Sequence, residues 1–253
     1  MAVLQEIVFF LDREMNVTGI EDDSLNGLQF EGRHGVQRVA CAVDACAYSF
    51  EKAVEGGADL LVVHHGMLWR NREPTPCTGV QKKKLKLLVE NDLSVYACHL
   101  PLDLHSRYGN NALIAKAVGV VKPKRWGDFH GTKIGFWGAL AKPVSLKVLA
   151  SRVAGFCGGE PRVLSYGARV VRRVGVVSGG GGSAVAEAAV LGLDAFVVGE
   201  LKQHEAVEAR DLGLSVVEAG HYNTETAGVK ALGRLLEKKF GVKSFFVDAP
   251  TGV

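Results

Sequence analysis

Short apolar runs alternate along the chain with segments of helical periodicity. Runs of branched residues, such as 60–63 and 195–198, are typical of strands that a parallel sheet buries on both faces. Between them apolar residues recur at helical spacing, as in residues 2–14, where they form one stripe. This alternation predicts α/β architecture with mixed, largely parallel sheets.

The same pattern places each expected element in the sequence. It predicts strands at 36–43, 60–63, 94–98, 134–140, around 163, 171–177, 195–198, 214–217 and 242–247. It predicts helices at 2–14, 49–55, 81–90, 112–118, 145–156, 184–191, 206–211 and 224–238, with an Asn of the pair 110–111 as N-cap of the helix at 112.

Two segments are expected to lie outside helices and strands. Residues 22–32 are polar and contain two glycines, which favours a loop that packs through its leucines and its phenylalanine. Residues 120–131 look like a break between units. We therefore expect a first α/β lobe at 1–120 and a second α/β segment at 121–253, of which 218–253 returns to complete the site of the first.

Composition and charge exclude several classes of protein. The 253 residues are 47% hydrophobic and 23% charged, as in an ordinary globular protein, and a net charge of +3 is too small to predict a nucleic-acid partner. No apolar run approaches the roughly 20 residues of a membrane span, and the first 20 residues do not resemble a signal peptide. The five cysteines form no CxxC pair, which favours reduced thiols in the cytoplasm.

A glycine run at 178–183 leads directly into an expected helix. Gly179, Gly181 and Ala184 satisfy the GxGxxA spacing of dinucleotide sites, with Glu200 after the next strand. Because this spacing is common in glycine runs, we favour a strand-to-helix turn.

Candidate metal-ligating side chains lie at the carboxyl ends of the expected strands. His64 and His65 follow the apolar run 60–63, and Gly66 then allows a sharp turn. Ligands of open α/β sheets gather at this end of the strands. Neighbouring strand residues point to opposite faces, so we expect the two imidazoles to hold two adjacent metals rather than chelate one, or to be satisfied by a carbonyl or water.

The strand expected at 94–98 also runs into polar residues, namely His99, Asp103 and His105. Pro101 favours an extended backbone between them, as in a ligand-bearing loop.

His221 and Glu225 stand four residues apart at the start of the last expected helix. Residues i and i+4 share a helix face, as in helical HExxH metal motifs. The alternatives are a capping carboxylate for Glu225 and a hydrogen-bonded ring for His221.

Taken together, His64, His65, Asp103, His221 and Glu225 supply enough ligands for two divalent transition-metal ions that share a bridging carboxylate. The set contains no thiolate, so zinc, iron, manganese, nickel and cobalt all suit it.

Five stretches, in order, resemble the motifs of one family: DSLNGLQFEG, LLVVHHGMLW, YACHLPLDLHSRYGNNALIAKAVG, VVGELKQHEAVEA and EAGHYNTE. They are similar to those of the Ngg-interacting-factor-three-like dinuclear metal centre proteins, often called GTP cyclohydrolase type 2 homologues. The resemblance covers about residues 2–248. It implies two interlinked α/β lobes around a dimetal cleft, a ring-shaped homohexamer, and the metal ligands His64, His65, Asp103, His221 and Glu225.

We expect a metal-dependent hydrolase that acts on a small nucleotide-like or phosphorylated substrate. The alternative is a non-catalytic metal-binding scaffold or regulatory partner protein. Asn26, Gln29 and Glu200 are candidate substrate contacts, and each could equally be a loop or turn hydrogen-bonder.

Overall fold

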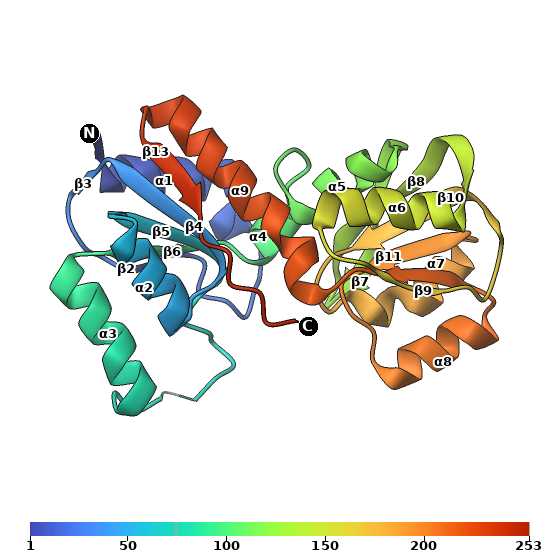
Figure 1. Ribbon diagram of the computed structural model, residues 1–253, viewed down its shortest axis with the longest axis horizontal. Helices are drawn as coiled ribbons and strands as arrows, with labels where there is room; N and C mark the ends of the chain where they lie inside the picture. Colours follow the sequence, from blue (N-terminus) through green and yellow to red (C-terminus); the bar gives the residue numbers. More distant parts are fainter. Residues whose placement is uncertain (74, 253) are drawn as a thin grey trace. The chain divides into compact units, whose positions relative to one another are not determined.

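The computed structural model describes residues 1–73 and 75–252, which form two compact units (Figure 1). Unit 1 comprises residues 1–102 and 228–249, and unit 2 comprises residues 103–227 and the chain from Pro250 onward. The chain therefore leaves unit 1 after Leu102 and returns to it at Gly228, whereas the sequence suggested a boundary near 120 and a return near 218.

Unit 1 is built on a five-stranded sheet. Its strand order is β13-β4-β5-β6-β2, with β2 antiparallel to β6 and the other neighbours parallel. These strands are β2 (Gly27–Phe30), β4 (Arg38–Asp44), β5 (Leu60–His65), β6 (Ser94–Ala97) and β13 (Lys243–Phe246). A small antiparallel pair, β1 (Ala2–Val3) and β3 (Gly35–Val36), lies outside this sheet.

Helices cover both faces of the unit 1 sheet. The helices are α1 (Leu4–Met15), η1 (Val17–Gly19), α2 (Ala47–Glu55), α3 (Gly79–Asn91) and the later part of α9 (His221–Phe240). Phe50 of α2 and Leu88 of α3 belong to the apolar core on one face. On the other face Tyr96 of β6 donates a hydrogen bond to Asp12 of α1, at 2.8 Å.

Unit 2 is a second three-layer α/β structure. Its sheet has the order β7-β8-β10-β11-β12-β9, in which β10, β11 and β12 are parallel and the outer pairings are antiparallel. The strands are β7 (Val120–Phe129), β8 (Thr132–Ser145), β9 (Arg162–Leu164), β10 (Val170–Val177), β11 (Ala195–Val198) and β12 (Ser215–Glu218).

Two pairs of helices enclose this sheet. Between strands the chain forms α4 (Leu100–Leu104), α5 (Asn110–Val118), α6 (Leu146–Cys157), η2 (Gly181–Ala184), α7 (Val185–Val190) and α8 (Gln203–Asp211). One apolar core joins α5 and α6 to the sheet, and another joins α7 and α8 to the opposite face. Mixed α/β architecture is therefore confirmed, with unit 1 largely parallel and unit 2 more evenly mixed.

Two segments that we expected outside regular structure form strands. Residues 27–30 are β2, which pairs with β6 more than 60 positions later in the chain. Residues 120–129 are β7, an edge strand that tolerates Pro123 because its outer side needs no hydrogen bond. The expectation of a loop at 22–32 was wrong for 27–30 and holds for the rest of the segment, where only an isolated bridge at Ser24 forms. The expectation of a break at 120–131 was wrong for 120–129. Such strand pairings depend on partners that are distant in the sequence.

Two local expectations for the residues that follow His99 were also wrong. Pro101 does not prevent a helix but lies in the first turn of α4, where a missing N–H costs nothing. The N-cap of α5 is Gly109, and Asn110 is already helical. The side chain of Asn110 instead donates to Asp103.

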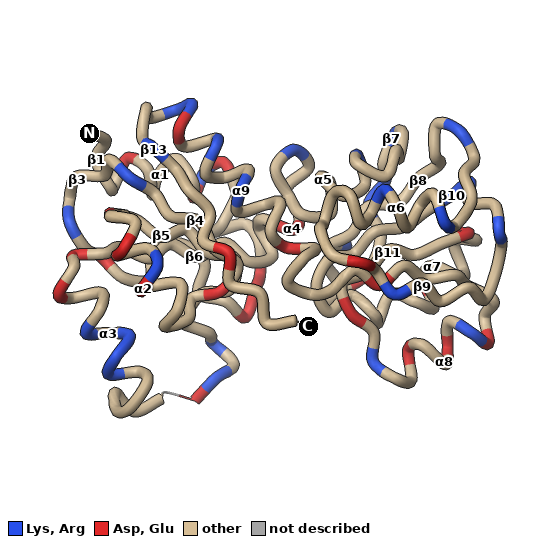
Figure 2. Tube along the Cα trace, viewed as in Figure 1, with Lys and Arg blue, Asp and Glu red and all other residues tan. Residues whose placement is uncertain are grey.

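Lysines give α3 much of its surface charge, visible as blue segments in Figure 2. Lys83 pairs with Glu51 at 2.5 Å and Lys86 with Glu90 at 3.6 Å, so two of these lysines have acidic partners within the unit. Among the described residues no helix is long and apolar enough to cross a membrane.

Candidate metal centre

The carboxyl ends of three parallel strands carry the polar residues of unit 1. Asp44 ends β4, His64 and His65 end β5, and His99 follows β6. This is the end of an open α/β sheet at which ligands bind.

His64 and His65 lie closer together than residues on opposite faces of a regular strand. Their ring centroids are 4.6 Å apart. Nδ1 of His64 donates to the carbonyl oxygen of Cys98 at 3.0 Å, and Nδ1 of His65 donates to Oδ1 of Asp44 at 2.9 Å. His64 is fully buried and His65 is partly buried.

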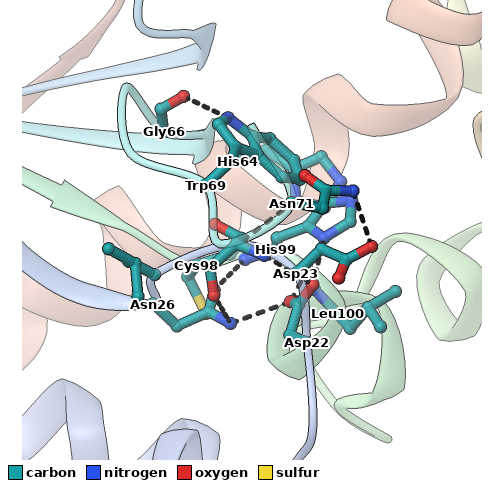
Figure 3. A network of polar contacts seen from close by, with 12 residues as sticks. Asp22, Asp23, Asn26, His64, Gly66, Trp69, Asn71, Cys98, His99 and Leu100 are labelled. Atoms are coloured by element: carbon teal, nitrogen blue, oxygen red, sulfur yellow. Dashed lines mark hydrogen bonds and ion pairs between the residues drawn. The ribbon is translucent and has the colours of Figure 1, made fainter. Parts of the chain in front are cut away.

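His99 joins this pair, and the sequence did not single it out as a ligand. One ring nitrogen from each of His64, His65 and His99 lies within 4.8 Å of the other two. The indole of Trp69 meets the His99 ring edge to face, with centroids 5.1 Å apart (Figure 3). The three imidazoles and the indole thus form one cluster within unit 1.

A buried carboxylate holds His99 in position. Asp22 accepts four hydrogen bonds: Oδ1 accepts from the backbone N–H of Ser24 and from Nδ1 of His99, and Oδ2 accepts from the side chain of Asn26 and the backbone N–H of Leu100 (Figure 3). Burial by itself raises the pKa of Asp22, but these hydrogen bonds and the charge of His99 together lower it.

Asn26 and Gln29 hold the surrounding loops. The side-chain oxygen of Asn26 accepts from the backbone N–H of His99 at 2.7 Å. The side-chain oxygen of Gln29 accepts from the backbone N–H groups of Met67 and Leu68, and its amide group donates to backbone carbonyls. Direct substrate contact by either residue stays a prediction.

Asp103 lies in unit 2, where α4 and the end of β10 meet. Its side chain is buried, and its Oδ1 accepts from the amide of Asn110 at 2.9 Å and from the hydroxyl of Ser178 at 3.2 Å. Asn111 links the same elements, because its oxygen accepts from the backbone N–H of Ser178.

His221 lies between two carboxylates in unit 2. Its Nδ1 is 3.2 Å from Oε1 of Glu200, and its Nε2 is 3.3 Å from Oε1 of Glu225, one helical turn further along α9. The hydrogen bond that the His221 ring donates to Glu225 outweighs burial and, with the further effect of Glu200, raises the pKa of His221 to about 9. Glu200 follows β11, so this group also lies at the carboxyl ends of parallel strands.

Gly179 leaves room for this cluster. Its φ of +59° lies in the left-handed region that favours glycine, and its N–H donates to the hydroxyl of Thr224. A β-carbon at this position would overlap Oε1 of Glu225 and lie 3.1 Å from Nε2 of His221. The glycine run therefore makes space for the carboxylate and the imidazole.

Comparison with known proteins identifies the family. The model of the Duf34/NIF3 (NGG1p interacting factor 3) family matches residues 2–251. The chain belongs to the DUF34/NIF3 family. A protein of Pyrococcus abyssi named "GTP cyclohydrolase 1 type 2 homolog" is 40% identical over 250 residues, with 98% of this chain and 99% of the relative covered. An Escherichia coli protein of the same name is 36% identical, with 97% of each covered.

Solved structures agree with this assignment to the DUF34/NIF3 family. A protein from Thermus thermophilus is 38% identical and superimposes with a TM-score of 0.92 over the full length of both chains. A protein called ybgI, of unknown function, is 34% identical, with the same TM-score and coverage.

Four histidines have the hydrogen-bonding arrangement of metal ligands. In His64, His65, His99 and His221 the Nδ1 atom faces an oxygen. In the metal-binding tautomer Nδ1 carries the proton and Nε2 carries the lone pair. The residues present therefore fit the metal centre that the DUF34/NIF3 resemblance implies, on the chemistry of the donor set and on the space left by Gly179.

The structure divides the expected ligands between the units. His64 and His65 belong to unit 1, and Asp103, His221 and Glu225 belong to unit 2. Sequence reasoning missed Asp22 and Asp44, which orient His99 and His65. Asp44 could have been found as the polar residue that ends a strand, whereas nothing local in the sequence links Asp22 to His99.

Proposed function

We propose that this chain binds two divalent transition-metal ions through His64, His65, Asp103, His221 and Glu225, and that it is a metal-dependent hydrolase. The observation that carries this proposal is the arrangement of His64, His65 and His221, whose Nδ1 atoms each face a carbonyl or carboxylate oxygen. Histidines that bind metals almost always have such a partner.

The buried carboxylates complete the donor set. Asp103 and Glu225 are both buried, and a buried carboxylate needs positive charge or hydrogen bonds nearby. We assign Glu225 as the carboxylate shared by both ions, because its oxygen already lies beside Nε2 of His221. Glu200 would then orient His221 through Nδ1 rather than contact substrate.

Divalent ions, when bound, polarise a substrate carbonyl or phosphoryl group and bring the pKa of a coordinated water towards neutrality. The chain supplies the surroundings for such chemistry. Trp69 packs against His99 at one side of the imidazole cluster, and Asp22 fixes the ring of His99 from a buried position. These contacts keep the imidazole cluster in one arrangement.

The substrate we propose is a small nucleotide-like or phosphorylated molecule. The support is twofold: the names of the curated relatives refer to GTP cyclohydrolase, and paired divalent ions are suited to displacement at phosphorus or at an electrophilic carbon. We further propose a cytoplasmic homohexamer, the assembly that the family resemblance implies.

The test combines metal content with a substrate screen. Protein stripped with EDTA is reloaded separately with zinc, manganese, iron, nickel or cobalt, and hydrolysis of GTP and simple phosphate esters is measured. We expect turnover with at least one metal and its loss in His65→Ala. His34→Ala is the matched control, since His34 is an exposed histidine of unit 1 outside the cluster.

The same screen distinguishes a hydrolase from the alternative, a non-catalytic metal-binding protein. A protein that binds two ions per chain but hydrolyses none of the substrates with any metal would be a metal-binding scaffold or regulatory partner. Light scattering of the same samples tests the oligomer, for which six copies are expected.

A further inference from the structure

His99 lies outside the ligand set that the DUF34/NIF3 resemblance implies, yet its ring is held as the rings of that set are held. Its Nδ1 donates to Asp22 at 2.9 Å, and the side chain of this carboxylate is only 2% exposed (Figure 3). A carboxylate that accepts from Nδ1 fixes the tautomer in which Nε2 carries the lone pair. His99 can therefore bind a cation through Nε2.

The ring of His99 lies against both histidines of β5. Its centroid is 5.0 Å from that of His64 and 5.5 Å from that of His65, and those two are 4.6 Å apart. One ring nitrogen of each residue lies within 4.8 Å of the other two. Nitrogen ligands of one tetrahedral ion lie roughly 3.3–3.4 Å apart, so side-chain rotation can bring the three nitrogens to a single ion.

The other two rings are oriented in the same way. Nδ1 of His64 donates to the carbonyl oxygen of Cys98 at 3.0 Å, and Nδ1 of His65 donates to Asp44 at 2.9 Å. Two carboxylates, Asp44 and the buried Asp22, therefore stand behind the three rings. Carboxylates in this position hold a metal-binding imidazole in place and make it a stronger ligand.

The surroundings of the three rings favour a small ion as the ligand. His64 is fully buried, and His65 and His99 are partly buried. Trp69 packs against the ring of His99. A coordinated transition-metal ion lies about 2.0–2.1 Å from each nitrogen, whereas a hydrogen-bonded water lies about 2.9 Å away, so the ion does not need a cavity the size of a water.

We propose that His64, His65 and His99 form a three-imidazole site, which binds one transition-metal ion within unit 1. This site deepens the proposed function and rests on it, because it gives one of the two proposed ions a further ligand. Imidazole ligands favour zinc, nickel and iron over magnesium and calcium, which prefer oxygen.

The test uses the full chain with two of the unit 2 ligands removed, in the double variant His221→Ala/Glu225→Gln. EDTA-stripped protein is loaded with zinc and desalted, and the zinc content is measured by elemental analysis. We expect the double variant to retain one zinc ion per chain. The affinity is then measured by competition with a chromophoric chelator, and thermal unfolding checks that the variant is folded.

His99→Asn, added to the double variant, separates the ligand from its structural role. The amide nitrogen of Asn takes roughly the place of Nδ1 and can still donate to Asp22, whereas no atom takes the place of Nε2. The melting temperature of the metal-free protein should therefore change little. The zinc affinity should fall about tenfold or more, since even the residues that orient a ligand contribute that much.

His34→Asn is the matched control, because His34 is an exposed histidine of unit 1 outside the three-imidazole site. Its zinc affinity should equal that of the double variant. The comparison of wild type with His99→Asn, each loaded with one equivalent of zinc, repeats the test in a chain that keeps every other ligand.

Pulsed electron paramagnetic resonance counts the imidazoles on the ion directly. Loaded with one equivalent of Cu(II), the double variant should show three coordinated imidazoles, and the same protein with His99→Asn should show two. Copper is the probe because it is paramagnetic and binds imidazole well.

The three-imidazole site and the proposed function fail in different ways. The site is overturned if His99→Asn and His34→Asn bind zinc alike, or if Cu(II) in the double variant has fewer than three imidazoles. Wild type that still binds two ions and hydrolyses substrate would then leave the proposed function intact. If His99→Asn weakens zinc binding but loaded wild type hydrolyses no substrate, the site stands and the hydrolase is overturned.

Discussion

Gly179 and Glu225 lie so close together that a β-carbon on residue 179 would overlap Oε1 of the Glu225 carboxylate. Gly179→Ala should therefore displace the carboxylate and lower the metal content of reloaded protein. The positive φ adds a strain of about 1 kcal/mol or more. Metal analysis together with thermal unfolding measures both effects.

Gly213→Ala is the control for that variant. Gly213 also has a positive φ, at +66°, but the nearest atom to an added β-carbon is 3.9 Å away. It should lose stability through backbone strain alone and keep its metal. Equal metal loss in the two variants would show that the fit between Gly179 and Glu225 is unimportant.

Asp22→Asn should destabilise unit 1 by about 2 kcal/mol. The amide cannot accept all four hydrogen bonds that the buried carboxylate accepts, and its NH₂ group would face donors. Asp23→Asn is the matched control because Asp23 is exposed. Urea denaturation measures the difference, and equal stabilities of the two variants would contradict the network.

The contribution of Asp22 to folding stability should decrease as the pH falls. The folded-state pKa of Asp22 lies below its ordinary value of 3.8, so its stabilisation is complete well above that pH and is lost as the pH falls through the folded pKa. The stability gap between wild type and Asp22→Asn should thus be constant from about pH 6 to 8 and shrink below 3.8. A gap that widens in acid would contradict this sign.

The imidazole of His221 should lose its proton only at high pH in metal-free protein. Glu225 and, more weakly, Glu200 outweigh burial and raise the pKa of His221 to about 9. NMR of the imidazole should show this value, with a decrease in Glu200→Gln and a larger one in Glu225→Gln. The stabilisation is present in full below 6.5 and is lost as the pH rises through about 9. If neither variant changes the pKa of His221, the two carboxylates do not cause its raised value.

Cys98→Ala tests whether Cys98 is itself a metal ligand or only positions the ligand His64 through its backbone. The backbone carbonyl of Cys98 accepts from His64, and the substitution keeps that carbonyl. Metal content should stay at the wild-type level, with roughly 1 kcal/mol lost from the buried thiol. His64→Ala should lose metal under the same conditions. If Cys98→Ala also loses metal, the ligand set is wrong.

The sequence predicted best what depends on local pattern. The apolar run at 195–198 coincides with β11, and the run at 60–63 forms most of β5, because buried parallel strands are continuous apolar segments. Strands β2 and β7 were missed because β2 is only four residues long and begins with a glycine, and β7 contains a proline. Their formation depends on pairing with β6 and β8.

The candidate ligands could likewise be identified from the sequence, whereas the residues that orient them could not. His64, His65 and the pair His221–Glu225 stand out as adjacent or helically spaced groups. The link between Asp22 and His99 spans 77 positions and exists only through tertiary structure. Glu200 seemed suited to contact substrate, and only the structure reveals that it faces Nδ1 of His221.

The central claim is that five residues hold two ions with Glu225 shared between them. The most direct measurement is the metal content per chain of fully reloaded wild type and Glu225→Gln, obtained by elemental analysis. Glu225→Gln keeps the size of the side chain but removes the charge that offsets repulsion between two neighbouring dications. The account predicts two ions per chain in wild type and one or fewer in Glu225→Gln; saturation of wild type at one ion, or two ions retained in Glu225→Gln, would contradict it.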